Sequence, residues 1–170
     1  MNEILTRTSI RAFKEQPVEQ EKLELILKAA MQAPSAGNQQ PWEFIVVTKR
    51  ELLDKLAMVS PYASALKTAQ AAIVLLNNEK YHRFNGQYVE QDLGACAQNI
   101  LLMCEHVGLG AVWLGITPDI ERMQFVSTLF ELPKEVSALA ILPLGYKQNS
   151  REAKSRYDES RVGYNCYNQH

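Results

Sequence analysis

Basic side chains are concentrated in two short segments near the two ends of the chain. Arg7 and Arg11 are four residues apart with Ser9 between them, so on a helix the two guanidinium groups share one face. Lys154 and Arg156 are two apart, so in an extended segment they point to the same side and suit one anion. Two guanidinium groups with a hydroxyl between them suit a phosphate or an electron-rich ring edge. Taken alone, each segment is more typical of a solvated basic surface.

An uncharged loop rich in side-chain amides lies between Pro34 and Pro41. It holds one hydroxyl and three carboxamides, from Ser35, Asn38, Gln39 and Gln40. A carboxamide presents a donor and an acceptor together, which matches a heterocycle whose edge alternates N–H and C=O groups. A polar turn that leads into a strand, with Trp42 and Phe44 in the core, explains the same residues equally well.

The bulk composition is that of one soluble globular domain. The chain has 170 residues, 18 of them basic and 19 acidic, and a formal net charge of −1, which gives no sign of a nucleic-acid or membrane partner. The first residues lack the apolar run of a signal peptide, and no apolar segment is long enough to span a bilayer. The three cysteines lack metal-ligand spacing, so we expect reduced thiols in a cytoplasmic protein without a metal.

Hydrophobic periodicity predicts the elements that must position these segments. Helices are expected over 19–33, 50–59, 88–107 and 119–129, the last opened by Pro118, and strands over 43–48, 71–76, 111–115 and 137–144. The helix over 88–107, which Gly108 ends, is apolar around so much of its circumference that it must be buried on more than one side, and a second chain is a natural source of cover. Residues 147–170 are too poor in aliphatic side chains to form a core, so they either wander or pack on something else.

The alternation of helices and strands, taken by itself, suggests a parallel doubly wound sheet. However, no glycine-rich turn joins a strand to a helix, because Gly108-Leu109-Gly110 follows a helix and enters a strand. This order argues against a standard dinucleotide site or P-loop.

Taken together, the chemistry-bearing segments resemble the nitroreductase family. The matching blocks are R-x-S-x-R-x-F at 7–13, P-S-x-x-N-x-Q-P-W-x-F at 34–44, G-L-G at 108–110, L-G-Y at 144–146 and K-x-R at 154–156. They span nearly the whole chain, and the block at 34–44 is the most specific of them.

The resemblance implies an FMN-dependent oxidoreductase. Such an enzyme passes reducing equivalents from NADH or NADPH through FMN to nitroaromatic, quinone or similar small acceptors by a ping-pong mechanism. The implied fold is α+β, a three-layer αβα sandwich with a mostly antiparallel central sheet, and it replaces the parallel sheet that alternation suggests. The implied assembly is an intertwined homodimer in which residues 147–170 of a single domain, 1–170, pack on the partner.

The same resemblance assigns a phosphate clamp by position. Arg7, Thr8 and Ser9 are expected to contact the FMN phosphate and ribityl chain, and Lys154 and Arg156 to complete the clamp, because a partly desolvated dianion needs several cations. Arg11 is expected near the flavin pyrimidine edge, where a cation stabilises the reduced ring.

Two other segments are implied to meet the flavin ring. A loop from the partner chain supplies Pro34, Ser35, Ala36, Asn38 and Gln40. A strand end brings a backbone N–H to the ring and comprises Leu114, Gly115 and Ile116. The resemblance assigns no catalytic acid or base, because the flavin supplies the chemistry.

Other functions remain open at this point. The same fold supports enone reduction, reductive dehalogenation and flavin fragmentation, and a non-catalytic FMN-binding module or a ligand-free dimerisation protein is a further alternative. Larger members carry a helical excursion over the pocket, where this chain has only residues 77–88, so 81–84 are candidates to cover it. Lys67 is the nearest match to a lysine that some members place beside the flavin. No ribose-reading motif selects NADH over NADPH.

Overall fold

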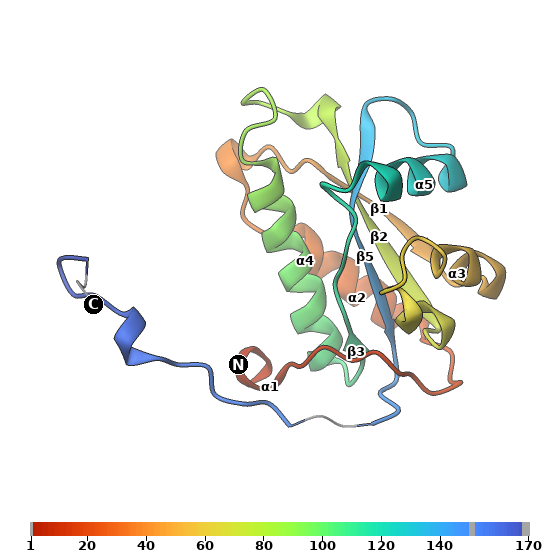
Figure 1. Cartoon of the computed structure of the whole chain (residues 1–170), viewed down its shortest axis with the longest axis horizontal. Helices are drawn as coiled ribbons and strands as arrows, with labels where there is room; N and C mark the ends of the chain where they lie inside the picture. Colours follow the sequence, from red (N-terminus) through yellow and green to blue (C-terminus); the bar gives the residue numbers. More distant parts are fainter. Residues whose placement is uncertain (1, 150–151, 168–170) are drawn as a thin grey trace.

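A five-stranded antiparallel sheet forms the middle layer of the protein (Figure 1). The computed structural model describes residues 2–149 and 152–167. The strands are β1 (Trp42–Val47), β2 (Ala71–Asn78), β3 (Gly110–Ala111), β4 (Leu114–Gly115) and β5 (Val136–Gly145). Their order is β1-β2-β5-β3, with β4 also on β5, and every pairing is antiparallel. The parallel sheet suggested by alternation is therefore wrong, and the antiparallel sheet implied by the family resemblance is confirmed.

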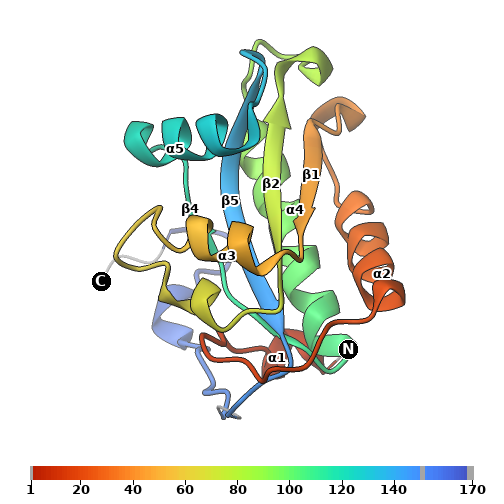
Figure 2. The same ribbon diagram turned by 90° about the vertical axis from the view of Figure 1, so that its right-hand side faces the viewer.

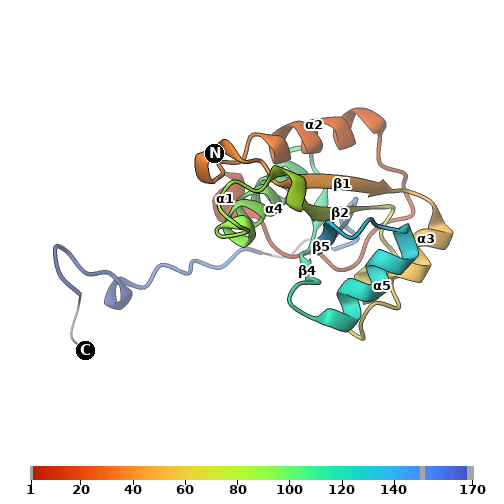
Figure 3. The same ribbon diagram turned by 90° about the horizontal axis from the view of Figure 1, so that it is seen from above.

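Helices cover both faces of this sheet, as the views in Figures 2 and 3 show. One face carries α2 (Gln20–Met31) and α4 (Val89–His106), with the short α1 (Glu3–Thr6) against the end of α4. The other face carries α3 (Arg50–Leu56) and α5 (Ile120–Phe130). Four short 3-10 turns complete the elements: η1 (Ala36–Asn38), η2 (Ser64–Lys67), η3 (Glu79–Tyr81) and η4 (Glu159–Arg161).

The central strands have no polar face because both of their sides are covered. In β2, Ile73 and Leu75 lie in the core beneath α2 and α4, whereas Val74 and Leu76 lie in the core beneath α3 and α5. Successive side chains of a strand point to opposite faces, so a strand between two helical layers must be apolar throughout.

The α4 helix is the longest element and packs with α2 on one face of the sheet (Figure 2). Its buried stripe includes Leu93, Ile100 and Cys104, and the chain leaves the helix through Gly108, whose φ of 78° is the left-handed conformation expected at this end. Half-buried Leu102 and Met103 line an open apolar groove that α4 shares with residues of α1 and α2. That a second chain covers α4 stays a prediction.

Two local predictions are wrong, and one segment is not helical. Residues 7–13 are extended, because Ile10 N–H donates to Ala111 O at 3.0 Å and the side chains of Ile10 and Phe13 are buried, so Arg7 and Arg11 do not share the face of a helix. The strand expected over 111–115 is split in two, with Trp113 partly exposed between β3 and β4. The helix α5 begins after Asp119, whose carboxylate accepts from Arg122 N–H at 3.2 Å, so the proline lies before the cap and not in the first turn.

The C-terminal segment leaves the body of the protein (Figure 1). Its aromatic side chains are solvent-exposed, with 73% of Tyr157, 76% of Tyr164 and 91% of Tyr167 accessible. Residues 150–151 and 168–170 of the expected extension lie outside the described residues. Within the described part of the chain, no helix combines the length and the apolar composition needed to cross a bilayer.

The cysteines differ sharply in environment, which gives a first prediction. Burial raises the pKa of the Cys96 and Cys104 thiols to about 12, whereas Cys166 is exposed in the tail. We expect a disulfide reagent such as DTNB at pH 8 to label one thiol in the native protein and three in urea, because the thiolate is the reactive form. A second fast-reacting thiol in the native protein would contradict the burial.

Candidate functional site

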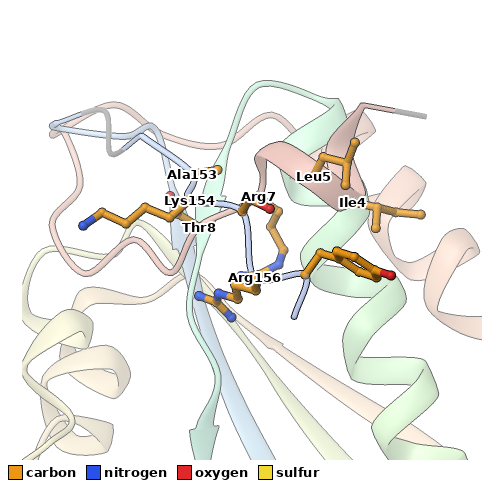
Figure 4. A pocket seen from close by; sticks show the side chains of 9 residues that line it. Ile4, Leu5, Arg7, Thr8, Ala153, Lys154 and Arg156 are labelled. Atoms are coloured by element: carbon orange, nitrogen blue, oxygen red, sulfur yellow. The ribbon is translucent and has the colours of Figure 1, made fainter. Parts of the chain in front are cut away.

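A pocket of about 480 Å³ lies where the N-terminal segment meets the C-terminal tail. Its lining consists of Ile4, Leu5, Arg7, Thr8, Ala153, Lys154, Ser155, Arg156 and Tyr157 (Figure 4). Four of these, Arg7, Thr8, Lys154 and Arg156, are predicted clamp residues that the structure brings together across nearly the whole length of the sequence. The lining residues carry three cations and no carboxylate, which is the composition that a dianionic phosphate requires.

The two arginines and the lysine of the pocket are not equivalent. The side chains of Arg7 and Arg156 extend into the same region, whereas Lys154 points away from Arg156 (Figure 4). The expectation that positions two apart in this extended segment converge on one anion is therefore not met by Lys154 and Arg156 in this structure.

The position of Arg7 is fixed by the docking of α1 on the end of α4. Glu3 Oε1 lies 2.8 Å from His106 Nδ1, and this hydrogen bond is the main reason why the pKa of Glu3 falls to about 2. The chain then runs beside β3, where Ser9 pairs with Ala111. Ser9 and Arg11 do not line the pocket, and Arg11 is exposed.

The strand end at Gly115 offers an open backbone surface. A Cβ atom added to Gly115 would meet no heavy atom within 4 Å, and the residue is exposed. Its carbonyl accepts from Arg122 Nη1 at 3.2 Å, while the next residue, Ile116, is buried and donates its N–H to Leu139 O at 3.0 Å. Leu114 is half-buried and pairs with Ile141 in β5. A planar ligand can therefore approach this backbone closely, as glycine permits.

The amide loop has an unusual backbone. Gly37, Asn38 and Gln40 all have positive φ, at 52°, 57° and 47°. Ser35 Oγ accepts from Gln40 N–H at 3.1 Å, and Gln40 Nε2 donates to Asn38 Oδ1 at 2.7 Å. The side chains of Asn38 and Gln40 face solvent, as does Pro34, while Ser35 and Ala36 are half-buried.

The clamp and the amide loop lie at opposite ends of α4 within one chain. Asp92, in the first turn of α4, bonds to the loop, and His106, at the last residue of α4, bonds to α1. The helix between these two residues rises by about 21 Å, at 1.5 Å per residue. The structure of one chain therefore does not bring the two predicted halves of the site together.

Several residues that organise the site were not identified from the sequence. Asp92 accepts from Ala36 N–H at 2.9 Å and from Gln39 Nε2 at 2.6 Å, and only 5% of it is exposed. The one signal that the sequence offers is a carboxylate in the first turn of a helix otherwise predicted to be buried. Arg122, whose guanidinium donates to the Gly115 carbonyl, is half-buried, and nothing in the sequence of its predicted helix marks it.

The short connection between β2 and α4 packs on the amide loop. Arg83 Nη1 donates to Gly37 O at 2.9 Å, and the Phe84 ring lies where a Cβ of Gly37 would stand. Phe84 and Tyr88 also form an edge-to-face pair with ring centroids 5.8 Å apart. Lys67 is exposed at the end of η2.

Comparison with known proteins identifies the family to which the chain belongs. The model of the nitroreductase family matches residues 4–60 and 57–146. The chain belongs to the nitroreductase family. A protein of Archaeoglobus fulgidus, provisionally named an NADH dehydrogenase/NAD(P)H nitroreductase, is 40% identical over 162 residues, which are 94% of this chain and 93% of that relative.

Solved structures of nitroreductase-family proteins share the fold. A Clostridium acetobutylicum protein, provisionally named an NADH oxidase, superimposes with a TM-score of 0.94 at 46% identity, covering 97% of this chain and 99% of that one. An FMN-dependent nitroreductase of Clostridium difficile superimposes with a TM-score of 0.90 at 29% identity, covering 98% and 100%. The family and fold inferred from the residue blocks are therefore confirmed.

Proposed function

We propose that this nitroreductase-family protein is an FMN-dependent oxidoreductase that passes reducing equivalents from NADH or NADPH to nitroaromatic, quinone or similar small acceptors. The observation that carries the proposal is the pocket lined by Arg7, Lys154 and Arg156, with no carboxylate among its lining residues. The names of the relatives, an NAD(P)H nitroreductase and an FMN-dependent nitroreductase among them, support the same cofactor and reductant.

The residues of the chain bind and orient the cofactor. Arg7 and Arg156 neutralise the phosphate, with Thr8 at the pocket wall, Ser9 beside it and Lys154 adding charge. Gly115 leaves the backbone open to the ring. When bound, FMN supplies the redox chemistry, taking two electrons from the nicotinamide and releasing them to the acceptor in separate half-reactions. Arg11 keeps its proposed place near the pyrimidine edge, as a solvent-exposed cation.

We propose further that the functional unit is a homodimer. Large hydrophobic side chains are exposed on the face that carries α1, α2 and α4, including 61% of Ile4, 76% of Leu5 and 50% of Met31. A second copy is the simplest cover for such a surface. A two-fold axis that sets two α4 helices antiparallel would bring the amide loop of each chain to the clamp of the other. The exposed tail, within 147–170, would then pack on the partner.

A cytoplasmic location completes the proposal. All three cysteines are unpaired, and two of them are buried on α4, which fits a reducing compartment. The net charge of −1 favours a small-molecule acceptor over a polyanionic partner.

The dimer arrangement predicts complementation between two defective chains. One chain carries Arg7→Ala with Arg156→Ala, and the other carries Ser35→Ala with Asn38→Ala. If the loop serves the partner's flavin, the heterodimer has one site with both defects and one intact site, so half of the sites should bind FMN with wild-type affinity. Differently tagged chains, purified as a heterodimer and titrated with FMN, provide the measurement. Two defective sites would show that the loop acts within its own chain.

The visible spectrum of the purified protein tests the function itself. We expect flavin absorbance, either as purified or after adding FMN, and bleaching of this absorbance when NADH or NADPH is added without oxygen. Reoxidation by a quinone or a nitroaromatic should restore the spectrum. A protein that binds FMN but is not bleached by either nucleotide is an FMN-binding module and not a reductase. A protein that binds no FMN is neither an FMN-dependent reductase nor an FMN-binding module.

A further inference from the structure

One buried carboxylate has both of its oxygens turned to the amide loop. Asp92 is the only acidic residue that is buried among the described residues. Its Oδ1 accepts from Ala36 N–H at 2.9 Å and its Oδ2 accepts from Gln39 Nε2 at 2.6 Å. The residue stands in the first turn of α4, where the helix dipole favours a negative charge. The helix dipole therefore stabilises the buried charge, and the loop donates hydrogen bonds to both carboxylate oxygens.

Gln39 connects Asp92 to residues 82–84, which lie on the other side of the loop. Only 4% of Gln39 is exposed, and its amide is fixed at both ends, because Nε2 donates to Asp92 while Oε1 accepts from Arg83 N–H at 3.0 Å. The guanidinium of Arg83 donates to Gly37 O at 2.9 Å. Hydrogen bonds thus run from α4 through the loop to residues 82–84 and back to the loop.

The buried position of Gln39 orients the side chains of Asn38 and Gln40. Asn38 and Gln40 flank Gln39, and both adopt left-handed backbone conformations, which are unfavourable for residues other than glycine. Such conformations persist only where the surroundings enforce them. With Gln39 held inside, the side chains of Asn38 and Gln40 are turned outward and kept exposed.

We infer that Asp92 is a positioning residue for the cofactor site. Acting through Ala36 and Gln39, it fixes the loop conformation in which the amides of Asn38 and Gln40 face the flavin held by the partner subunit. The inference rests on the proposed function and on the proposed dimer, and it adds a residue that does not itself touch the cofactor.

Exchanging the acidic and amide side chains of Asp92 and Gln39 tests the inference, because the donors and acceptors around them can be paired in only one way. In Asp92→Asn, the carboxamide has one acceptor oxygen for two donors, so a donor faces a donor in either orientation. In Gln39→Glu, two carboxylates face each other. In the double variant Gln39→Glu with Asp92→Asn, the new amide accepts from Ala36 N–H and donates to the new carboxylate, which still accepts from Arg83 N–H. Only the double variant restores every bond, and its net charge is that of the wild type.

The measurement is the FMN dissociation constant of the apoprotein, followed by flavin fluorescence. We expect each single variant to weaken FMN binding roughly tenfold or more and the double variant to return close to the wild-type value. Thermal melting of the apoproteins shows whether each variant folds. Wild-type affinity in Asp92→Asn, or a double variant as weak as the singles, overturns the inference.

A heterodimer separates positioning from general destabilisation. When Asp92→Asn lies on the chain that also carries Arg7→Ala and Arg156→Ala, the one remaining clamp meets the altered loop and FMN binding should weaken. When it lies on the other chain, that clamp meets a wild-type loop and binding should be unchanged. Equal weakening in both arrangements contradicts positioning across the interface. If the wild-type protein itself binds no FMN, the proposed function fails instead.

Discussion

Removal of the two arginines of the clamp is expected to lower FMN affinity by roughly 100- to 10,000-fold. A hydrogen bond to a charged group contributes about 1.5–3 kcal/mol, so Arg7→Ala or Arg156→Ala alone should weaken binding roughly 10- to 150-fold. The double variant approaches the product of the two effects only if each guanidinium meets the phosphate independently. The measurement is a fluorescence titration of apoprotein with FMN at one fixed salt concentration.

Two controls make the result specific to the pocket. Lys134→Ala removes the same charge at an exposed position outside the pocket lining and should leave the dissociation constant unchanged. Lys154→Ala should have a smaller effect than Arg156→Ala, because the lysine side chain points away from Arg156 (Figure 4). An unaltered dissociation constant in the double arginine variant would refute the clamp.

Helices and strands of this fold are predictable from sequence where the hydrophobic periodicity of a single segment is strong. The long stripe of α4 and the apolar runs of β2 and β5 were placed within a few residues. Strand direction was not predictable from alternation, because the order of elements does not record how the chain turns between them. The antiparallel sheet followed only from the residue blocks that resemble the family.

Long-range hydrogen bonds explain what the sequence did not reveal about the site. The N-terminal segment is extended because Ile10 is paired with a strand about a hundred residues later, at Ala111, a contact that the local sequence does not record. Asp92 was overlooked because Leu93 and Cys96 beside it define a core stripe, and its partners are more than fifty residues away. Residue types single out the arginines that we propose bind phosphate, but only tertiary structure shows which polar group holds the loop.

Substitution of Gly110 and of Gly115 should have opposite effects on stability and on FMN binding, because a Cβ atom would clash at Gly110 and meet no atom at Gly115. Gly110 and Gly115 both lie in short strands paired with β5. A Cβ on Gly110 would stand 2.6 Å from Ile10 Cγ1, so Gly110→Ala should destabilise the apoprotein by about 1–3 kcal/mol, measured by urea unfolding. This loss would also disturb the segment that leads to Arg7.

Gly115→Val should instead leave folding intact and weaken FMN binding. A Cβ atom at Gly115 would meet no heavy atom within 4 Å, the residue is exposed, and valine is favoured in strands, so urea unfolding of the apoprotein should match the wild type. If the flavin ring lies against this backbone, the added methyl groups occupy its place, and FMN affinity should fall at least roughly tenfold, the lower part of the range for overpacking a filled site. Normal FMN affinity in Gly115→Val would place the ring elsewhere, and a large loss of stability would show that the space beside Gly115 is filled by the protein itself.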